Sequence, residues 1–345
     1  MKISKKSKIL IVGSEDKFTL EYIYFKTFKY LNFEVNLLNL ESSISNRVTA
    51  KMKMTFSNIN HFFLQKKTLN YFKQNKKKYD LIIFFKSIFL DKDTLKKIKL
   101  MNKNTLIANI FTDDPFDVLN PVISNKKFLR CIPQFDAFCI WSYRLKKKLE
   151  SKFKIKSIYL PFGYDSLNNR RYVSYGKNKI QINFIGTYDS NRSEILKSIK
   201  IKKIIYGGNW ERFKINNFND FIISKHIYGQ KINKIMNESA ISLNILREQN
   251  YTSHNMKTFE IPSNNGLMLT TRSKEQNIFF KENVSCYMYS SKKELNSKIN
   301  YILANPKKAK IVRKNGFKQV KKHSYTNRVK KLVKELNSLK MKFLA

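Results

Sequence analysis

Two neighbouring carboxylates follow a short apolar run. Asp113 and Asp114 come directly after Leu106 to Phe111, which has the length and composition of a buried strand. A carboxylate at the end of such a strand can accept a proton from an attacking hydroxyl group. Successive side chains point in different directions, so we expect one carboxylate to face a substrate and the other to cap the segment after Pro115. Both are candidate catalytic residues, and capping alone is the alternative.

A second group of polar side chains lies between residues 241 and 271. Arginine and lysine neutralise phosphate charge, and a carboxylate one helical turn further on can accept both hydroxyl groups of a ribose. The layout therefore suits a nucleoside diphosphate, and an ordinary α/β crossover with solvated polar residues is the alternative. The candidate donor-binding residues in this segment are Arg247, His254, Asn255, Lys257, Glu260, Asn265 and Gly266.

The loop after the first apolar run offers a third candidate site. Gly13, Ser14 and Asp16 lie between a predicted strand and a predicted helix, where backbone N–H groups can receive an anionic or hydroxyl-rich ligand. We take them as candidate acceptor-binding residues, and a plain turn capped by Ser14 or Asp16 is the alternative. Asp91 and Asp93 have the spacing of a metal-binding pair, but they open a predicted helix, which capping explains. We predict no metal site.

Alternating strands and helices must position these residues. Apolar runs alternate with segments of helical periodicity in both halves, which predicts α/β domains with parallel sheets. The carboxyl ends of parallel strands meet at one edge of a sheet, where the candidates would gather. The predicted strands cover residues 8–13, 34–40, 80–85, 106–111, 135–141 and 157–160 in the first half, and 180–185, 204–206, 240–246 and 266–270 in the second.

The chain is long enough for two domains, since 345 residues exceed the usual size of one core. Residues 165–179 are polar and lack an apolar period, so they read as a linker between domains at 1–164 and 180–324. We expect two doubly wound, Rossmann-like domains that face a central cleft. Residues 325–345 form a final helix with an apolar stripe that includes Leu332 and Leu336.

The formal net charge of +43 would attract nucleic acid, anionic lipid or phosphorylated substrates. The lysines are scattered along the chain, so a compositional bias on ordinary solvated surfaces is the simpler interpretation. No apolar run reaches the roughly 20 residues that span a bilayer, and the first run is too short for a signal peptide. Cys131, Cys139 and Cys286 show no metal-binding spacing. We expect a cytoplasmic protein.

Several segments together resemble the CgeB-type, glycosyltransferase family 1-like group of GT-B enzymes. They are TDDPF at 112–116, IYLPFGYD at 158–165, FIGTYDSNR at 184–192, YGGNW at 206–210, HNMKTFEIPSNNGLML at 254–269 and GFKQVKKHSYTNRV at 316–329. The resemblance implies that the C-terminal domain binds a nucleotide-sugar, with Gly186 and Arg192 near its phosphates and Glu260 at its ribose. It also implies an N-terminal acceptor domain, a last helix that crosses back to that domain, and His254 near the donor or assisting the acceptor hydroxyl.

The chain departs from this group at two places. Relatives often carry a second glutamate seven residues before the first, where this chain has Ser253, and a glycine turn where it has Asn265. Asparagine tolerates a positive φ, so the turn can survive, but the missing glutamate leaves the stereochemistry of transfer open.

The expected function is therefore metal-independent transfer of a sugar from a nucleotide-sugar, used as a co-substrate without a cofactor. The acceptor would be a glycan, a lipid-linked molecule or a protein, in bacterial surface polysaccharide or glycoconjugate synthesis. An anionic surface at the inner membrane face is a further expected partner. The alternatives are a catalytically idle GT-B-like scaffold at the membrane and a basic nucleic-acid-binding protein, the latter motivated by charge and abundant aromatic residues.

Overall fold

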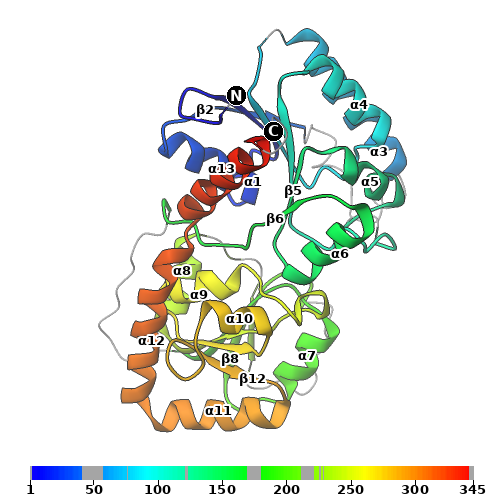
Figure 1. Ribbon diagram of the computed structural model, residues 1–345. Coiled ribbons are helices and arrows are strands. Elements are labelled where there is room, and N and C mark those ends of the chain that lie inside the picture. The colour runs from blue at the N-terminus through cyan, green and yellow to red at the C-terminus, as the bar shows by residue number, and fades with distance from the viewer. Residues whose placement is uncertain are drawn as a thin grey trace. The chain divides into compact units, whose positions relative to one another are not determined.

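The computed structural model describes residues 2–40, 57–75, 77–120, 123–168, 180–210, 221–224, 227 and 229–341. It divides into two compact units, shown in Figure 1. Unit 1 comprises Met1–Pro161 and Arg328–Ala345, and unit 2 comprises Phe162–Asn327. Residues 169–179 of the predicted linker lie outside the described residues. Each unit has a six-stranded sheet, and every strand pair in both sheets is parallel. The predicted pair of α/β, Rossmann-like domains is confirmed.

Unit 1 has the strand order β2-β1-β3-β4-β5-β6. Its central strands are apolar on both faces because helices cover both sides of a parallel sheet, and all five residues of β3 are buried. The strands are β1 (Lys8–Gly13), β2 (Glu34–Asn39), β3 (Leu81–Phe85), β4 (Leu106–Phe111), β5 (Ala137–Ile140) and β6 (Ser157–Tyr159). The helices are α1 (Leu20–Tyr30), α3 (Ser57–Gln74), α4 (Lys92–Met101), α5 (Lys126–Cys131) and α6 (Tyr143–Phe153).

Unit 2 has the strand order β12-β11-β10-β7-β8-β9. Its core lies between this sheet and its helices and includes Ile182, Phe184, Leu243 and Leu269. The strands are β7 (Ile180–Ile185), β8 (Lys203–Tyr206), β9 (Phe221–Ser224), β10 (Ser239–Asn244), β11 (Met268–Thr271) and β12 (Tyr287–Tyr289). The helices are α7 (Ser190–Lys197), α8 (Gln230–Glu238), α9 (Lys257–Ser263), α10 (Lys274–Phe279), α11 (Lys292–Ala304) and α12 (Pro306–Val320).

Each sheet has a point where successive connections leave in opposite directions. In unit 1 the chain passes from β1 outward to β2 and then returns to β3 on the other side of β1. In unit 2 it passes from β7 to β8 and β9 and then returns to β10 on the other side of β7. Ligands of open α/β sheets bind beyond the carboxyl ends of the strands at such switch points. The loops after β1 and β3, and those after β7 and β10, are therefore the places to examine.

The last helix, α13 (Tyr325–Met341), belongs to unit 1 from Arg328 onward. Its stripe residues Val329, Leu332 and Leu336 are fully buried. Asn337 fixes the N-terminal segment, because its Oδ1 accepts from the N–H of Ile3 at 2.7 Å and its Nδ2 donates to the Ile3 carbonyl at 3.0 Å. The final helix thus completes the core of the unit formed by the start of the chain.

Two further sequence expectations concern capping and membranes. Asp91 is the N-cap of α4, and its Oδ1 accepts from the N–H of Thr94 at 2.8 Å. The capping interpretation of this acidic pair is confirmed. Within the described residues, no helix combines the length and apolar character that a bilayer crossing requires.

Candidate functional site

Arg192 lies at the switch point of unit 2. Its guanidinium donates from Nε and Nη2 to the carbonyl of Ile245 at 3.1 and 3.0 Å, and from Nη1 to the carbonyl of Thr187 at 3.1 Å. Thr187 follows β7 and Ile245 follows β10. The side chain therefore ties together the carboxyl ends of the two strands that flank the switch point.

Arg247 brings a second guanidinium to the same place. Its Nε is buried and has no hydrogen-bond partner among the described residues. Burial lowers the pKa of Arg192 to about 10, and the charge of Arg247 is the next largest cause of that shift. A buried donor without an acceptor, beside a like charge, is unfavourable unless an anion binds there. These two arginines are the strongest indication of a ligand in unit 2.

Tyr251 and Tyr289 lie near these two arginines, and the sequence interpretation missed both. Tyr251 accepts a hydrogen bond from Asn191 Nδ2 at 2.5 Å, and Tyr289 accepts one from Thr271 Oγ1 at 3.3 Å. Burial raises the pKa of each tyrosine, while the charge of Arg192 lowers it. Their hydroxyl groups are near enough to feel the arginine, so they can orient a polar ligand there. In the sequence, only their position at or after the end of a strand, at the carboxyl edge of the sheet, could have identified them as site residues.

Gly186 is held in a close backbone contact at the end of β7. Gly207 has φ +151°, and a Cβ there would lie 1.9 Å from the Gly186 carbonyl oxygen. That oxygen accepts from Trp210 Nε1 at 2.7 Å, and the Gly186 N–H donates to Tyr206 at 2.8 Å. Both backbone groups of Gly186 are thus used within unit 2. Its approach to donor phosphates stays a prediction.

Glu260 and Lys257 form an ion pair in the first turn of α9. Lys257 Nζ lies 2.5 Å from Glu260 Oε2, and each side chain is about one quarter exposed. This pair could serve as a preformed site for a ribose. Both hydroxyl groups of the ribose would donate hydrogen bonds to the Glu260 carboxylate, and the Lys257 ammonium group could turn toward a phosphate. The pair is compatible with the predicted donor contacts, which stay a prediction.

A buried polar network holds α9 in place. Asn255 donates to Asn244 Oδ1 at 2.8 Å and accepts from the N–H of Thr258 at 3.1 Å. Thr258 donates to Gln276 Oε1 at 3.0 Å, and Gln276 donates to Thr270 at 2.6 Å. Asn255 therefore anchors the start of α9 to β10, so it positions Glu260 through the helix. Its side-chain contacts are all within the protein fold.

His254 lies in the core of unit 2, where its side chain has no exposed surface. Its Nε2 accepts from the N–H of Phe162 at 3.2 Å, and Nδ1 lies 3.1 Å from Glu275 Oε2. The ring packs edge-on against Phe162 and Phe279. These contacts engage both ring nitrogens, so they favour a structural role over the predicted catalytic and donor-binding roles.

The turn after α9 forms as the sequence suggested. Asn265 has φ +54°, and the N–H groups of Asn265 and Gly266 donate back to Pro262 and Ile261 at 3.0 and 2.9 Å. This pattern is a Schellman motif with asparagine in the left-handed position. Arg313, on α12, donates to the Asn265 carbonyl. The asparagine does replace the glycine of the relatives, while the predicted donor contacts of Asn265 and Gly266 stay predictions.

In unit 1, the loop after β1 is organised by its own side chains. Asp16 Oδ1 accepts from the N–H of Phe18 at 3.0 Å, and Ser14 Oγ accepts from the N–H of Asp16 at 3.2 Å. The N-cap of α1 is Thr19. Ser14 and Asp16 therefore shape a turn ahead of the helix, and neither is its cap. Asp16 is exposed beside Gly13 at the switch point, so acceptor binding stays a prediction for this loop.

The two carboxylates after β4 have different partners. Asp114 Oδ1 accepts from the N–H of Phe116 at 2.9 Å, and its Oδ2 lies 3.3 Å from Arg144. Asp113 Oδ2 lies 2.6 Å from Lys86 Nζ, with about a quarter of each side chain exposed. Asp114 therefore caps the turn that contains Pro115, as expected for one of the two carboxylates. That Asp113 faces a substrate stays a prediction.

Lys86, which the sequence interpretation missed, stands in unusual backbone geometry. Lys86 and Ser87 have φ of +54° and +47°, directly after β3. Consecutive left-handed residues other than glycine are costly, about 1–3 kcal/mol each, and are concentrated at functional sites. The turn places the Lys86 ammonium against Asp113 beside the switch point. Nothing in the sequence Lys86-Ser87 predicts two consecutive residues in the left-handed conformation.

No metal cluster is found in the described part of the chain, as judged by groups of three or more histidine, cysteine or acidic residues. The three cysteines are free and buried, and burial raises the pKa of each thiol. These thiols are therefore poor nucleophiles and poor ligands.

A family model matches most of the second half of the chain. Residues 192–334 match a family model described as glycosyl transferase-like. No curated protein matches the sequence significantly. The segment that matches begins at Arg192 and contains the loop between β10 and α9, α9 itself and most of α13.

Solved structures match nearly the whole chain. The N-terminal domain of Candida albicans trehalose-6-phosphate phosphatase is 11% identical, with a TM-score of 0.70 and 98% of both chains covered. Sucrose-phosphate synthase from Thermosynechococcus elongatus is 10% identical, with a TM-score of 0.70 and coverage of 98% of this chain and 99% of its own. T4 phage BGT, in complex with its UDP-glucose substrate, is 13% identical, with a TM-score of 0.59 and coverage of 97% and 98%. At these identities the likeness shows the fold alone, which is the two-domain GT-B fold.

Proposed function

We propose that this glycosyl transferase-like protein with the GT-B fold transfers a sugar from a nucleotide-sugar donor to an acceptor hydroxyl group. The observation that carries the proposal is the pair Arg192 and Arg247 at the switch point of unit 2, with the buried Nε of Arg247 unsatisfied. A diphosphate supplies the two negative charges that this pair lacks. T4 phage BGT, which shares the fold, has UDP-glucose as its substrate.

The roles of the side chains follow from their chemistry. The acceptor oxygen attacks the anomeric carbon, the bond from that carbon to the diphosphate breaks, and the nucleoside diphosphate leaves with the electron pair. Arg247 and Arg192 stabilise the charge that develops on the leaving group. Glu260 holds the ribose, and Asp113, in unit 1, takes the proton from the acceptor hydroxyl. Lys86 keeps the Asp113 carboxylate oriented.

Metal independence is part of this proposal. The arginine pair provides the cationic charge that a divalent ion provides in other transferases, and the acidic pair at Asp91 serves as a helix cap. Turnover should therefore persist in EDTA. A complete loss that manganese restores would overturn metal independence and leave the transfer activity itself standing.

For the biological role, we infer synthesis of a bacterial surface polysaccharide or glycoconjugate at the inner face of the membrane. The support is the resemblance of the motifs and the net charge of +43, which favours an acceptor that carries phosphate or sits on anionic lipid. Flotation with anionic and neutral liposomes tests the membrane part. Equal behaviour with both kinds of vesicle would remove its basis.

The transfer reaction is tested by following release of nucleoside diphosphate from UDP-, GDP-, dTDP- and CMP-sugars, with and without candidate glycan acceptors. We expect release from one donor, stimulated by an acceptor and reduced by about 10²–10⁴-fold in Asp113→Asn. Donor binding without release under every condition would favour the idle scaffold, for which the replacement of the second glutamate by the buried Ser253 is the supporting observation.

A further inference from the structure

A cavity of about 570 Å³ lies in unit 2 at the amino end of β12, between that strand, α11 and α12. Tyr287, the first residue of β12, lines it, whereas Tyr289 at the other end of the strand lies near Arg192. The cavity therefore opens at the edge of the sheet opposite the donor site. Its volume is in the range of pockets that hold small ligands, about 300–1,000 Å³. None of the residues assigned above to donor or acceptor lines it.

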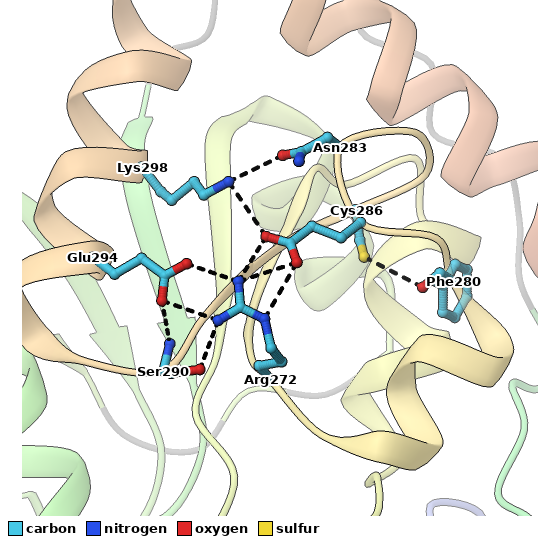
Figure 2. Close-up of polar contacts among 8 residues, drawn as sticks. Arg272, Phe280, Asn283, Cys286, Ser290, Glu294 and Lys298 are labelled. Atoms are coloured by element: carbon cyan, nitrogen blue, oxygen red, sulfur yellow. Dashed lines mark hydrogen bonds and ion pairs between the residues drawn. The ribbon is translucent and has the colours of Figure 1, made fainter.

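The charged side chains that line the cavity are lysines. Lys298 and Lys308 contribute to its wall, and no described carboxylate does. Glu282, which does not line the cavity, pairs with Arg272 at 2.8 Å and with Lys298 at 3.3 Å. Figure 2 shows this network. Lys298 also donates to Asn283 Oδ1 at 3.0 Å, and Glu294, which lies on α11, forms an ion pair with Arg272. The network fixes Lys298 in place, and Lys308 adds positive charge at the wall.

Two tyrosines give the cavity its shape. The rings of Tyr287 and Tyr301 lie 6.3 Å apart between centroids and are inclined by 68°. The ammonium groups of Lys298 and Lys308 each lie 5.9 Å from one of these rings. The two rings pack edge to face against each other, so they hold no ligand between them, and the exposed Tyr301 ring is the face on which a sugar ring can stack. Asn283 and Ser297, which also line the cavity, supply hydrogen-bonding groups.

We propose that this cavity binds an acidic saccharide, a sugar ring that carries a carboxylate or phosphate group, at a site separate from the donor site. The ring stacks on Tyr301, the anionic group lies against Lys298 and Lys308, and the hydroxyl groups bond to Asn283 and Ser297. The choice of a saccharide rests on the proposed function, because a transferase that extends an acidic glycan gains from holding the chain away from its reacting end.

Titration calorimetry of the full chain tests the proposal with trigalacturonate as the acidic probe and maltotriose as the neutral one. We expect the wild type to bind trigalacturonate at least about tenfold more tightly. Tyr301→Ala and Lys308→Gln should each weaken that binding about fivefold or more. Tyr30→Ala and Lys310→Gln are the matched controls, since Tyr30 is exposed in unit 1 and Lys310 is exposed on α12 without lining the cavity.

Equal weakening in Lys310→Gln, or no weakening in Tyr301→Ala and Lys308→Gln, would overturn the proposal. Binding of UMP or inorganic phosphate that Tyr301→Ala abolishes, with no preference for trigalacturonate, would identify a different ligand and also overturn it. UDP, GDP, dTDP and CDP are titrated into the same variants. Absence of binding of all four in every protein, together with the expected saccharide pattern, would count against the donor site alone, so the two failures are distinguishable.

Discussion

Arg247 stands beside Arg192 with its own Nε buried and unsatisfied, while Arg192 is satisfied by backbone carbonyls on both sides of the switch point. The Arg192 side chain therefore helps to hold the fold, whereas the fold supplies no acceptor for the Nε of Arg247. We therefore expect the two substitutions to affect the stability of the protein differently.

Arg247→Gln should leave the free energy of unfolding unchanged or raise it by up to about 1 kcal/mol, because it removes a repulsive charge from Arg192. Arg192→Met should lower it by about 2 kcal/mol or more, because the carbonyls of Ile245 and Thr187 lose their donors. Urea unfolding of both variants measures the difference. A large destabilisation by Arg247→Gln would show that its guanidinium also holds the fold.

The two carboxylates after β4 should respond differently to the same substitution. Asp113→Asn removes the group that takes the acceptor proton, and turnover should fall by about 10²–10⁴-fold with donor binding retained. Asp114→Asn keeps an oxygen that accepts from the N–H of Phe116, so it should retain most activity. Steady-state kinetics with separate donor-binding measurements distinguish the two. Equal losses in both variants would contradict the assignment of Asp113.

Acid should weaken unit 2 through Glu294. Its hydrogen bond to Arg272 holds the pKa of this carboxyl below its ordinary 4.5. The unfolded state therefore binds this proton first as the pH falls, so the stabilisation is present above pH 4.5 and is lost as the pH falls through the folded pKa. Urea midpoints at pH 7 and pH 3.5 should differ less in Glu294→Gln than in the wild type.

Glu15→Gln is the control for the acid experiment, because Glu15 is an exposed carboxylate in unit 1. It should keep the pH dependence of the wild type. An unchanged difference between the two pH values in Glu294→Gln would show that the Arg272 network does not couple protonation to folding.

The last helix should be essential to unit 1. Leu332 on α13 has no exposed surface, so Leu332→Ala should destabilise the protein by about 2–5 kcal/mol. Lys334→Ala, on the same helix, is the control because its side chain is partly exposed and its removal should change stability by about 0.5 kcal/mol or less. Thermal unfolding checks both, and similar small effects would mean that α13 packs only loosely on unit 1.

The sequence was sufficient for the sheet of unit 1 and for four strands of unit 2, because parallel strands such as β3 are apolar on both faces and uninterrupted apolar runs are easy to recognise. It missed β9 and β12, which are only four and three residues long. It also predicted that one of Asp113 and Asp114 caps the segment at Pro115, and Asp114 does so. Arg192 came from the resemblance. Glu260 came from the layout of polar residues at 241–271, which alone left donor binding and a solvated crossover equally supported.

The sequence was insufficient where the role of a residue depends on which distant residues the fold brings into contact with it. His254 was predicted as a donor-binding or catalytic residue, but its ring is buried and its Nε2 accepts from the N–H of Phe162, a residue 92 positions away along the chain. Lys86 was missed because its significance comes from a left-handed backbone and an ion pair to Asp113. Neither long-range burial nor a strained φ leaves a pattern in the local sequence.

The most direct test of the central claim is calorimetric titration of UDP, GDP, dTDP and CDP, with their monophosphates, into the wild type, Arg247→Gln and the charge-matched control Lys310→Gln. We predict that one diphosphate binds at least about tenfold more tightly than its monophosphate, that Arg247→Gln loses about tenfold or more of this affinity, and that Lys310→Gln retains it. No binding of any diphosphate, together with steeply salt-dependent binding of oligonucleotides, would contradict the donor site and identify a nucleic-acid-binding protein.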